Sequence, residues 1–576
     1  MSTVAEHIVT ALAQQGVKTV WGVVGDALNP VTDAIRRNDD IDWVGVRHEE
    51  AGAFAASAQA QLTGGLGVCM GTVGPGSIHL LNGLYDAKKS HAPVLALCGQ
   101  VPLAELGSDF FQEVNNDVVF ADVAVFNHTI TSPEQLPGML ERAVQAALSE
   151  RGVAVLTLPG DVGGLDLPKG KPEARFIAPP AQVVPDADAV RDAAERIDAA
   201  GKVTLLVGIG AREAREEVLA LAEKLSAPMV LTLKAKEGLE RENPFQVGQT
   251  GLIGNPAARR ALDQCDLLLM LGTDFPYSDW YPEGKVVVQV DERGAHLGRR
   301  TPVDAGIVGD AGLTARALLD RVSAKADRDH LEDAAGRYAS WREDQKQLAD
   351  PKFEDSGLVH KLRAKFDNPD QRIRPEALAD ALNTYAAADA IFTSDTGMST
   401  VWLSRFVELH GTRRLVGSYN LGSMANAMPQ ALGAQALDKA RQVIAFCGDG
   451  GLTMLLGDVI TAVAYELPVK LVVFDNGRLG MVKLEQEQGG LPEFGTVLAN
   501  PDLAAVARAM GLHGIRVEGA DTLHDAVREA LAHPGPVLLD VITNPDEISL
   551  PPRVKVADGW GFAVAKLSEE LESRRS

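Results

Sequence analysis

The residues best suited to chemistry in this chain are a carboxylate and an amide that follow two apolar runs. Asp449 comes one glycine after the run Val443–Cys447, and Asn476 comes shortly after the run Val469–Phe474. The stretch Leu452–Glu466 between them has helical composition, so the three pieces predict one strand–helix–strand unit. Because open α/β sheets bind ligands at the carboxyl ends of their strands, we expect both side chains at one ligand site.

The chemistry of this pair points to a metal ion and a phosphate group. Asp449 and Asn476 offer a carboxylate oxygen and an amide oxygen, the hard ligands that Mg²⁺ or Ca²⁺ prefers. Gly450 and Gly451 let the backbone approach a diphosphate, and the start of a helix favours its negative charge. Asp449 alone also fits a plain strand–turn–helix with polar caps, but an Asn spaced correctly after a second strand favours the metal site.

A second carboxylate that could take part in acid–base chemistry stands near the N-terminus. Glu49 lies in the run Arg47–Glu50, directly after the predicted strand Trp43–Val46. An acidic pair in this position also fits the solvated start of a helix, where negative charge is favourable. The run by itself therefore leaves both interpretations open.

The elements that must position these residues repeat one pattern along the whole chain. Short Val/Ile/Leu runs that end in Gly or Asp alternate with stretches rich in Ala, Glu and Arg. This alternation is typical of parallel sheets covered by helices on both faces. We predict an α/β protein of three doubly wound parallel-sheet domains, at 1–180, 181–350 and 360–540, with a short C-terminal tail at 541–576.

Composition excludes several classes of protein. The 576 residues include 55 Lys and Arg against 78 Asp and Glu, a net charge of −23, so nucleic acid is not an expected partner. The four cysteines form no CxxC pair, which argues against a disulfide framework or zinc site and for a reducing cytosol. No secretory signal is recognised, and the apolar runs are far shorter than the roughly 20 residues that span a bilayer.

The spacing of the Gly-Asp-Gly around Asp449 from Asn476 resembles the diphosphate-binding motif of thiamine-diphosphate enzymes. One departure is Asp475, where that family usually carries Asn. The resemblance implies that Mg²⁺ is ligated by the side chains of Asp449 and Asn476 and by the backbone carbonyl of Arg478. It also implies that Glu49 hydrogen-bonds the cofactor's aminopyrimidine ring and so promotes deprotonation of the thiazolium C2.

The resemblance extends to the segment that supports the bent cofactor, Gly417–Pro429. There Met424 would be the bulky side chain beneath the bend, although a methionine of this kind also serves as core filler. In this family the cofactor lies between the first domain of one subunit and the third domain of another, so a homo-oligomer is implied. The implied thiamine-diphosphate contacts are Glu49, Gly422, Ser423, Met424, Asp449, Gly450, Gly451, Asn476, Gly477, Arg478, Leu479 and Gly480.

Further segments are similar to the pyruvate oxidase and acetolactate synthase branch of the family. The segments Gly74–Gly76 and Phe111–Glu113 resemble active-site loops of the first domain, and Phe111 and Gln112 would face the substrate from the partner subunit. Met481 and Glu485 match positions that shape the substrate pocket, although residues there also fit plain helix packing. The catalytic residues implied by the resemblance are Glu49, Phe111, Gln112, Met481 and Glu485.

The central domain is expected to bind FAD, an expectation that rests on the resemblance to pyruvate oxidases. A nicotinamide fold would need an acid at the end of the second strand, and the predicted strand Met229–Leu233 is followed by Lys234. Asp291, at the end of the predicted strand Val286–Val290, is placed to accept hydrogen bonds from ribose hydroxyls. An ordinary α/β domain without ligand is the alternative. The implied FAD contacts are Thr250, Gly251, Leu252, Ile253, Thr273, Asp274, Phe275, Pro276, Tyr277 and Asp291.

Over nearly its whole length the chain resembles the quinone-dependent pyruvate dehydrogenases, also called pyruvate:quinone oxidoreductases. The resemblance implies oxidative decarboxylation of pyruvate to acetate and CO₂, with electrons passed to a membrane quinone and subunits that form a tetramer. An acetolactate synthase-like carboligase and a phosphate-dependent pyruvate oxidase that uses O₂ are the alternatives. The tail Gly559–Ser576 carries an apolar stripe with a neutral polar face, which suits either packing over the active site or docking on the inner face of the cell membrane.

Overall fold

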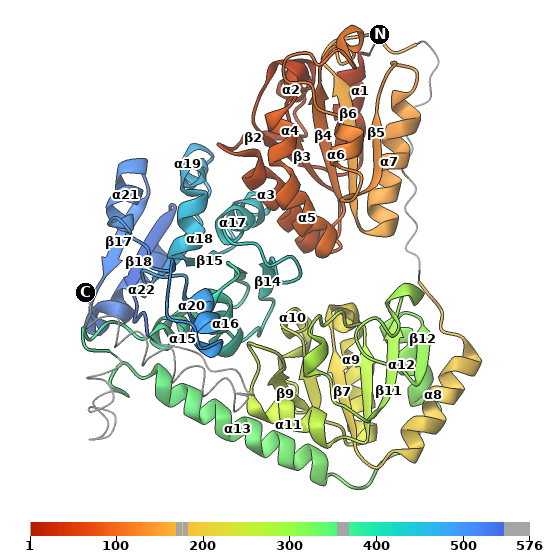
Figure 1. Cartoon of the computed structure of the whole chain (residues 1–576), viewed down its shortest axis with the longest axis vertical. Helices are drawn as coiled ribbons and strands as arrows, with labels where there is room; N and C mark the ends of the chain where they lie inside the picture. The colour runs from red at the N-terminus through yellow and green to blue at the C-terminus, as the bar shows by residue number, and fades with distance from the viewer. Residues whose placement is uncertain (1, 169–175, 177–181, 354–367, 547–576) are drawn as a thin grey trace.

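The computed structural model describes residues 2–168, 176, 182–353 and 368–546. It contains three six-stranded sheets, and every strand pair within them is parallel. Helices cover both faces of each sheet (Figure 1), so the predicted fold class of three parallel-sheet α/β domains is confirmed. Residues 169–175, 177–181 and 354–367, near the predicted domain boundaries, and most of the tail 541–576 lie outside the described residues.

The first and third sheets have the same strand order. Numbered from the first strand of each domain, both run 2-1-3-4-6-5. The first sheet consists of β2 (Asp42–Gly45), β1 (Thr19–Gly22), β3 (Gly67–Gly71), β4 (Val94–Gln100), β6 (Val153–Pro159) and β5 (Ala124–Thr129). The third consists of β14 (Arg414–Gly417), β13 (Ile391–Ser394), β15 (Val443–Gly448), β16 (Lys470–Asp475), β18 (Val537–Ile542) and β17 (His513–Val517).

The central sheet is wound differently, in the order 6-5-4-1-2-3. Successive strands are added on one side of the first strand and then, from the fourth strand on, on its other side. The crevice between the first and fourth strands is therefore a topological switch point. The strands are β12 (Ala305–Val308), β11 (Val286–Asp291), β10 (Leu267–Leu271), β7 (Val203–Val207), β8 (Met229–Leu231) and β9 (Gln246–Gln249).

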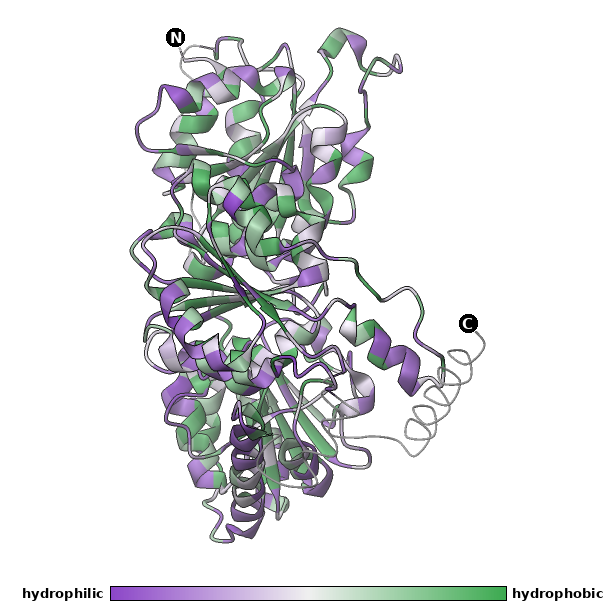
Figure 2. Cartoon of the chain, turned by 90° about the vertical axis from the view of Figure 1, so that its left-hand side faces the viewer, coloured by the Kyte–Doolittle hydropathy of each residue, from purple (hydrophilic) through white to green (hydrophobic). Residues whose placement is uncertain are grey.

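The helices form the outer layers. Figure 2 shows strands that are mostly hydrophobic lying inside helices with hydrophilic outer surfaces, as expected when helices bury one stripe each. Around the first sheet lie α1 (Val4–Gln14), α2 (Asn29–Arg36), α3 (Glu49–Thr63), α4 (Pro75–His79), α5 (Leu81–Lys89), α6 (Asn116–Val119) and α7 (Leu136–Glu150). Around the central sheet lie α8 (Ala187–Ala199), α9 (Arg215–Leu225), α10 (Lys236–Leu239), α11 (Pro256–Gln264), α12 (Ala311–Leu319) and α13 (Asp329–Ala349). Around the third lie α15 (Pro375–Tyr385), α16 (Met398–Phe406), α17 (Ala427–Leu437), α18 (Asp449–Met454), α19 (Val459–Ala464), α20 (Gly480–Gln488), α21 (Leu503–Met510) and α22 (Leu523–Ala532).

The first and third domains share one hydrophobic cluster, built where α3 packs against α17 (Figure 1). The approach is close, because a Cβ atom at Gly433 of α17 would lie 2.3 Å from the backbone oxygen of Ala55 in α3. Asp458 adds polar contacts, since its carboxylate accepts hydrogen bonds from the backbone N–H groups of Arg47 (2.6 Å) and His48 (3.1 Å). The loop before α3 is therefore held by the third domain.

The single helix predicted over Leu452–Glu466 is wrong. The structure has α18, a short 3₁₀ turn at Leu456–Asp458 and then α19. Leu455 leaves the helical region at the break, with φ −118° and ψ 28°. The break brings Asp458 to the first domain, so a contact between domains overrides the helical preference of this stretch.

One buried glutamate joins all three domains. Glu237 of the central domain accepts hydrogen bonds from Arg212 Nη1 of its own domain (2.6 Å) and from Arg414 Nε (2.5 Å) and Leu415 N (2.9 Å) of the third. Arg414 in turn donates to the backbone oxygen of Leu62 in the first domain (3.1 Å).

Among the described helices, none combines the length and the apolar composition that crossing a membrane requires.

Candidate active site

The structure brings Asp449 and Asn476 to the same edge of the third sheet. β15 and β16 are paired in parallel with Gly448 opposite Phe474, so both strands end together. Asp449 is the first residue of α18 and only 2% exposed. Burial raises the pKa of Asp449 to about 7; the hydrogen bond from Asn500 opposes that shift, and the charge of Asp475 adds to it.

The loop after β16 is fixed from outside by the segment that precedes α21. The backbone N–H of Leu479 donates to the oxygen of Thr496 (2.8 Å), and that of Leu498 donates to the oxygen of Gly477 (2.8 Å). The guanidinium of Arg478 is turned toward Glu493, at 2.5 Å. The loop that would supply the metal ligands therefore has a fixed backbone, as ligation through a main-chain carbonyl requires.

The residues at this edge fit Mg²⁺ and a diphosphate. The expected ligands are all hard oxygens, which suits Mg²⁺. A Cβ built at Gly450 would lie 2.8 Å from Cδ2 of Leu479, so a larger residue here would displace that side chain. Gly477 has a φ of +64°, a conformation that glycine adopts without strain, and a Cβ at Gly480 would lie 3.0 Å from the amide nitrogen of Asn476.

A buried carboxylate that the sequence analysis did not identify holds this loop in place. Asp395 follows β13 and accepts hydrogen bonds from the backbone N–H groups of Ala427 (2.9 Å) and Gly448 (3.1 Å). Burial raises the pKa of Asp395 to about 7. A Cβ at Gly451 would lie 2.3 Å from its Oδ2, which explains why glycine stands there. Asp395 directly follows a strand, as Asp449 does, and this position could have identified it from the sequence.

The predicted support segment lies over the same loop. Met424 Cε would lie 3.4 Å from a Cβ built at Gly450, which places the methionine against the Gly-Asp-Gly turn. Gly422 has a φ of +82°, and Ser423 Oγ donates to the oxygen of Met424 (2.9 Å). Ser423 Oγ also accepts from Asn82 of the first domain (2.9 Å). Met424 is thus placed where a side chain could support a ligand bound to this loop.

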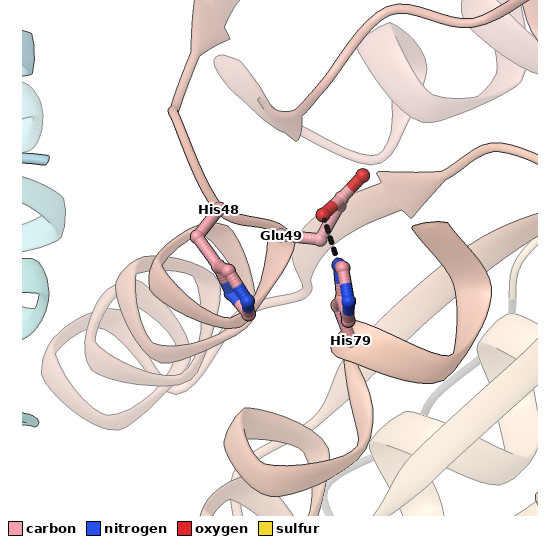
Figure 3. A group of neighbouring side chains, drawn as sticks. All are labelled: His48, Glu49 and His79. Atoms are coloured by element: carbon pink, nitrogen blue, oxygen red, sulfur yellow. Dashed lines mark hydrogen bonds and ion pairs between the residues drawn. The ribbon is translucent and has the colours of Figure 1, made fainter. Parts of the chain in front are cut away.

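Glu49 is the first residue of α3, and its side chain is 8% exposed. Figure 3 shows its carboxylate beside the ring of His79, with 2.9 Å between Oε2 and Nδ1. The His79 ring stacks on His48 at 4.4 Å between centroids. The other oxygen, Oε1, would lie 3.0 Å from a Cβ at Gly76, so both carboxylate oxygens face residues of α4. Potential ligand atoms of these three side chains lie within 4.8 Å of one another.

The first-domain residues expected to face the substrate stay within their own domain. In the described part of the chain, no hydrogen bond or ion pair links Glu49, Phe111 or Gln112 to the third domain. Phe111 is 79% exposed, and Gln112 has a φ of +66° and packs against Gly74. A site completed by a partner subunit remains a prediction that suits this arrangement.

Two segments of the central domain that were expected to touch FAD meet in the structure. A Cβ at Gly251 would lie 3.0 Å from Cζ of Phe275 and 3.6 Å from Cδ2 of Tyr277. Beside them, Thr250 Oγ1 and Gln249 Nε2 are buried without a hydrogen-bond partner among the described residues. Of the other expected contacts, Thr273 is buried, Ile253 is half-buried, and Leu252 and Pro276 are exposed.

The two acids of the expected FAD site are both engaged. Asp274 is paired with Arg299 and lies 3.6 Å from Arg300. Asp291, the last residue of β11, lies 3.2 Å from Nδ1 of His296 and accepts from the backbone N–H of Arg293 (2.9 Å). The arginines beside Asp274 and the unpaired polar atoms of Thr250 and Gln249 are groups that a dinucleotide could contact, and FAD binding stays a prediction.

Helix α20 connects the two regions. Met481 is half-buried against the third-domain core, and Ile253 packs on the same cluster. Glu485 is exposed, and its charge contributes to a raised pKa of Tyr277, after the larger effect of burial. The expected substrate helix and the expected flavin segment are therefore neighbours.

Comparison with known proteins decides the family. Models described as the N-terminal TPP binding domain, the central domain and the C-terminal TPP binding domain of thiamine pyrophosphate enzymes match residues 2–119, 190–318 and 395–541. The chain belongs to the thiamine pyrophosphate enzyme family. The central match contains the whole central sheet, whereas the other two cover the first four strands of the first sheet and most of the third.

Members of this family with different names resemble the chain to a similar degree. The Bacillus subtilis protein YdaP, whose full name is "Putative thiamine pyrophosphate-containing protein YdaP", is 37% identical over 577 residues, covering 100% of this chain and 97% of that protein. The pyruvate oxidase of Lactiplantibacillus plantarum is 32% identical, covering 94% and 88%. The acetolactate synthase of Mycobacterium bovis is 31% identical, covering 100% and 92%. These relatives share the family of this chain, and their names cover more than one reaction.

Proposed function

We propose that this thiamine pyrophosphate enzyme oxidatively decarboxylates pyruvate. In the reaction, pyruvate, water and a quinone yield acetate, CO₂ and the quinol, so the two electrons lost by the carbonyl carbon reduce the quinone. Mg²⁺, thiamine diphosphate and FAD are the proposed cofactors. When bound, thiamine diphosphate supplies the electron sink that lets CO₂ leave, and FAD supplies the two-electron acceptor.

The observation that carries this proposal is the proximity of the expected flavin segment to α20. Transfer of electrons from the thiamine site to a flavin requires adjacent sites. Glu485 acts electrostatically on Tyr277, and Ile253 packs on the cluster that includes Met481. The similarity to a pyruvate oxidase over 94% of the chain supports the same reaction class.

The chain's own residues have distinct proposed roles. Asp449, Asn476 and the carbonyl of Arg478 would hold the metal and, through it, the diphosphate. Glu49 would exchange a proton with the aminopyrimidine ring, with His79 keeping its carboxylate oriented. The exposed Phe111 of a partner subunit, with the neighbouring Gln112, would cover the substrate and exclude water.

An acetolactate synthase-like carboligase is the alternative, and the similarity of the Mycobacterium bovis acetolactate synthase extends over 100% of this chain. A single experiment separates the two. Pyruvate is added anaerobically to the purified enzyme, and the colour of oxidised flavin is followed. Bleaching supports the oxidase, whereas formation of acetolactate without bleaching supports the carboligase. A phosphate-dependent oxidase would instead need phosphate and O₂, and would form acetyl phosphate.

The quinone, a lipid surface and a tetramer are further parts of the proposal. The tail 541–576 would bring a cytoplasmic enzyme to the inner face of the membrane through its apolar stripe. Pyruvate turnover with a soluble quinone analogue, with and without anionic liposomes, tests this. If liposomes neither bind the enzyme nor change its rate, membrane docking is refuted. Sedimentation of the full-length enzyme tests the tetramer.

A further inference from the structure

One side chain outside the expected ligand set touches both acids at the metal edge. Asn500, in the segment before α21, donates from Nδ2 to Asp449 Oδ2 at 2.6 Å and to Asp475 Oδ1 at 2.8 Å. An amide nitrogen has two N–H groups and no acceptor capacity, so it can serve two carboxylate oxygens at once. No other side chain described at this edge bridges the two acids.

The bridge matters because the acids are crowded and buried. Asp449 and Asp475 are 2% and 6% exposed, and they end neighbouring strands of one sheet. Asp540, on the adjacent strand β18, adds a third carboxylate, which is paired with Arg516 at 2.7 Å. Like charges in a poorly solvated site repel one another, so without a donor between them Asp449 and Asp475 would turn apart.

The contact also leaves capacity for a cation. Asn500 uses one oxygen of Asp449, while a carboxylate offers about four lone-pair sites. Asp475 is held independently at its Oδ1 by the backbone N–H of Gly477, at 3.2 Å. Asn500 therefore fixes the orientation of Asp449 without occupying all of its acceptor sites.

We propose that Asn500 is a positioning residue for the metal site, which holds Asp449 in its ligating orientation by bridging it to Asp475. The inference rests on the proposed role of Asp449 as a Mg²⁺ ligand. Residues that orient metal ligands typically contribute 10–100-fold to metal affinity, and we expect an effect of about this size.

The test is a double-mutant cycle on the full-length enzyme stripped of cofactors. Isothermal titration calorimetry measures the Kd for Mg²⁺ at saturating thiamine diphosphate. Asn500→Ala should weaken Mg²⁺ binding by about 10–100-fold. Adding Asp475→Asn should restore most of that affinity, because an amide at 475 faces Asp449 in place of the lost donor and one negative charge is removed. Asn38→Ala, a change on the surface of the first domain, is the control and should leave the Kd unaltered.

Three outcomes overturn the inference. An Asn500→Ala Kd within about twofold of wild type shows that the bridge does not matter, provided that Asp449→Asn does abolish binding. A weakened Kd without recovery in the double variant shows that Asn500 acts on folding rather than through the two acids. If Asp449→Asn itself leaves the Kd unaltered, the metal site and this inference fail together. Thermal melting of each stripped variant identifies losses due to unfolding.

Discussion

Replacing Glu49 with Gln tests the proposed chemistry most directly. The side chain is buried, its Oε2 lies 2.9 Å from His79 Nδ1, and its Oε1 faces the tight backbone at Gly76. Glutamine has the same shape, so packing at the start of α3 should survive while the ability to exchange a proton is lost. General acid–base catalysis is typically worth about 10²–10⁴ in rate. At about 1.36 kcal/mol per factor of ten, the barrier should rise by about 3–5 kcal/mol.

The assay is pyruvate-dependent reduction of an artificial dye at saturating thiamine diphosphate and Mg²⁺. Glu50→Gln is the matched control, because it removes the neighbouring carboxylate only. A glutamine oxygen can still accept the hydrogen bond that Asn82 Nδ2 donates to Glu50 Oε1 at 2.7 Å. We expect the Glu49 variant to lose about 10²–10⁴ in kcat and the Glu50 variant to stay within about threefold. The flavin spectrum of both variants should match wild type.

A Glu49→Gln enzyme that turns over within about tenfold of wild type would refute the reasoning, since a group that transfers a proton cannot be replaced by an amide at so small a cost. Equal losses in both variants would also count against it, because they would indicate damage to the start of α3 rather than to the chemistry.

Three further predictions concern packing, domain docking and pH. Gly451→Ala should abolish retention of thiamine diphosphate on gel filtration, because its Cβ would lie 2.3 Å from Asp395 Oδ2. Glu237→Ala should destabilise domain docking by about 3 kcal/mol, because Arg212 and Arg414 lose their buried carboxylate partner. A lower Tm and faster limited proteolysis would show this loss, and an unchanged Tm would contradict it. Burial lowers the pKa of His91 from 6.5 to about 4. Between these pH values the unfolded chain binds a proton at His91 and the folded chain does not, so the free energy of unfolding should fall as the pH drops from about 6.5 to 4. His91→Asn should remove at most about 3 kcal/mol of this pH-dependent loss of stability, measured by thermal melts between pH 7.5 and 4.5. Plots of stability against pH that run parallel for wild type and variant would contradict the prediction.

The sheets could be predicted well because parallel strands are buried on both faces. The strands predicted at Val443–Cys447 and Val469–Phe474 coincide with β15 and β16 to within one residue at each end. The helix over Leu452–Glu466 could not be predicted correctly, because its break depends on the contact of Asp458 with another domain. Local patterns carry no information about such distant partners.

The same limit applies to the site. The rule that ligands bind at strand ends was sufficient to bring Asp449 and Asn476 together, and applied to β13 it would also have found Asp395. Asn500 lies in an irregular segment, and only the folded chain shows that it reaches two acids from 25 and 51 residues away. His79 was missed for a similar reason, since nothing in a helix of five residues indicates that its ring meets Glu49.

The shared strand order of the first and third domains has a mechanical consequence. α3 follows the second strand of its sheet, and α17 follows the second strand of the other, so the two helices that pack together are topological counterparts. The chain thus carries an internal pseudo-dimer. Glu49 begins one of its two central helices, and Met424 lies in the loop that leads into the other. A bulkier residue at Gly433, where the helices approach closely, would push the two helices apart and so displace Glu49 and Met424 together.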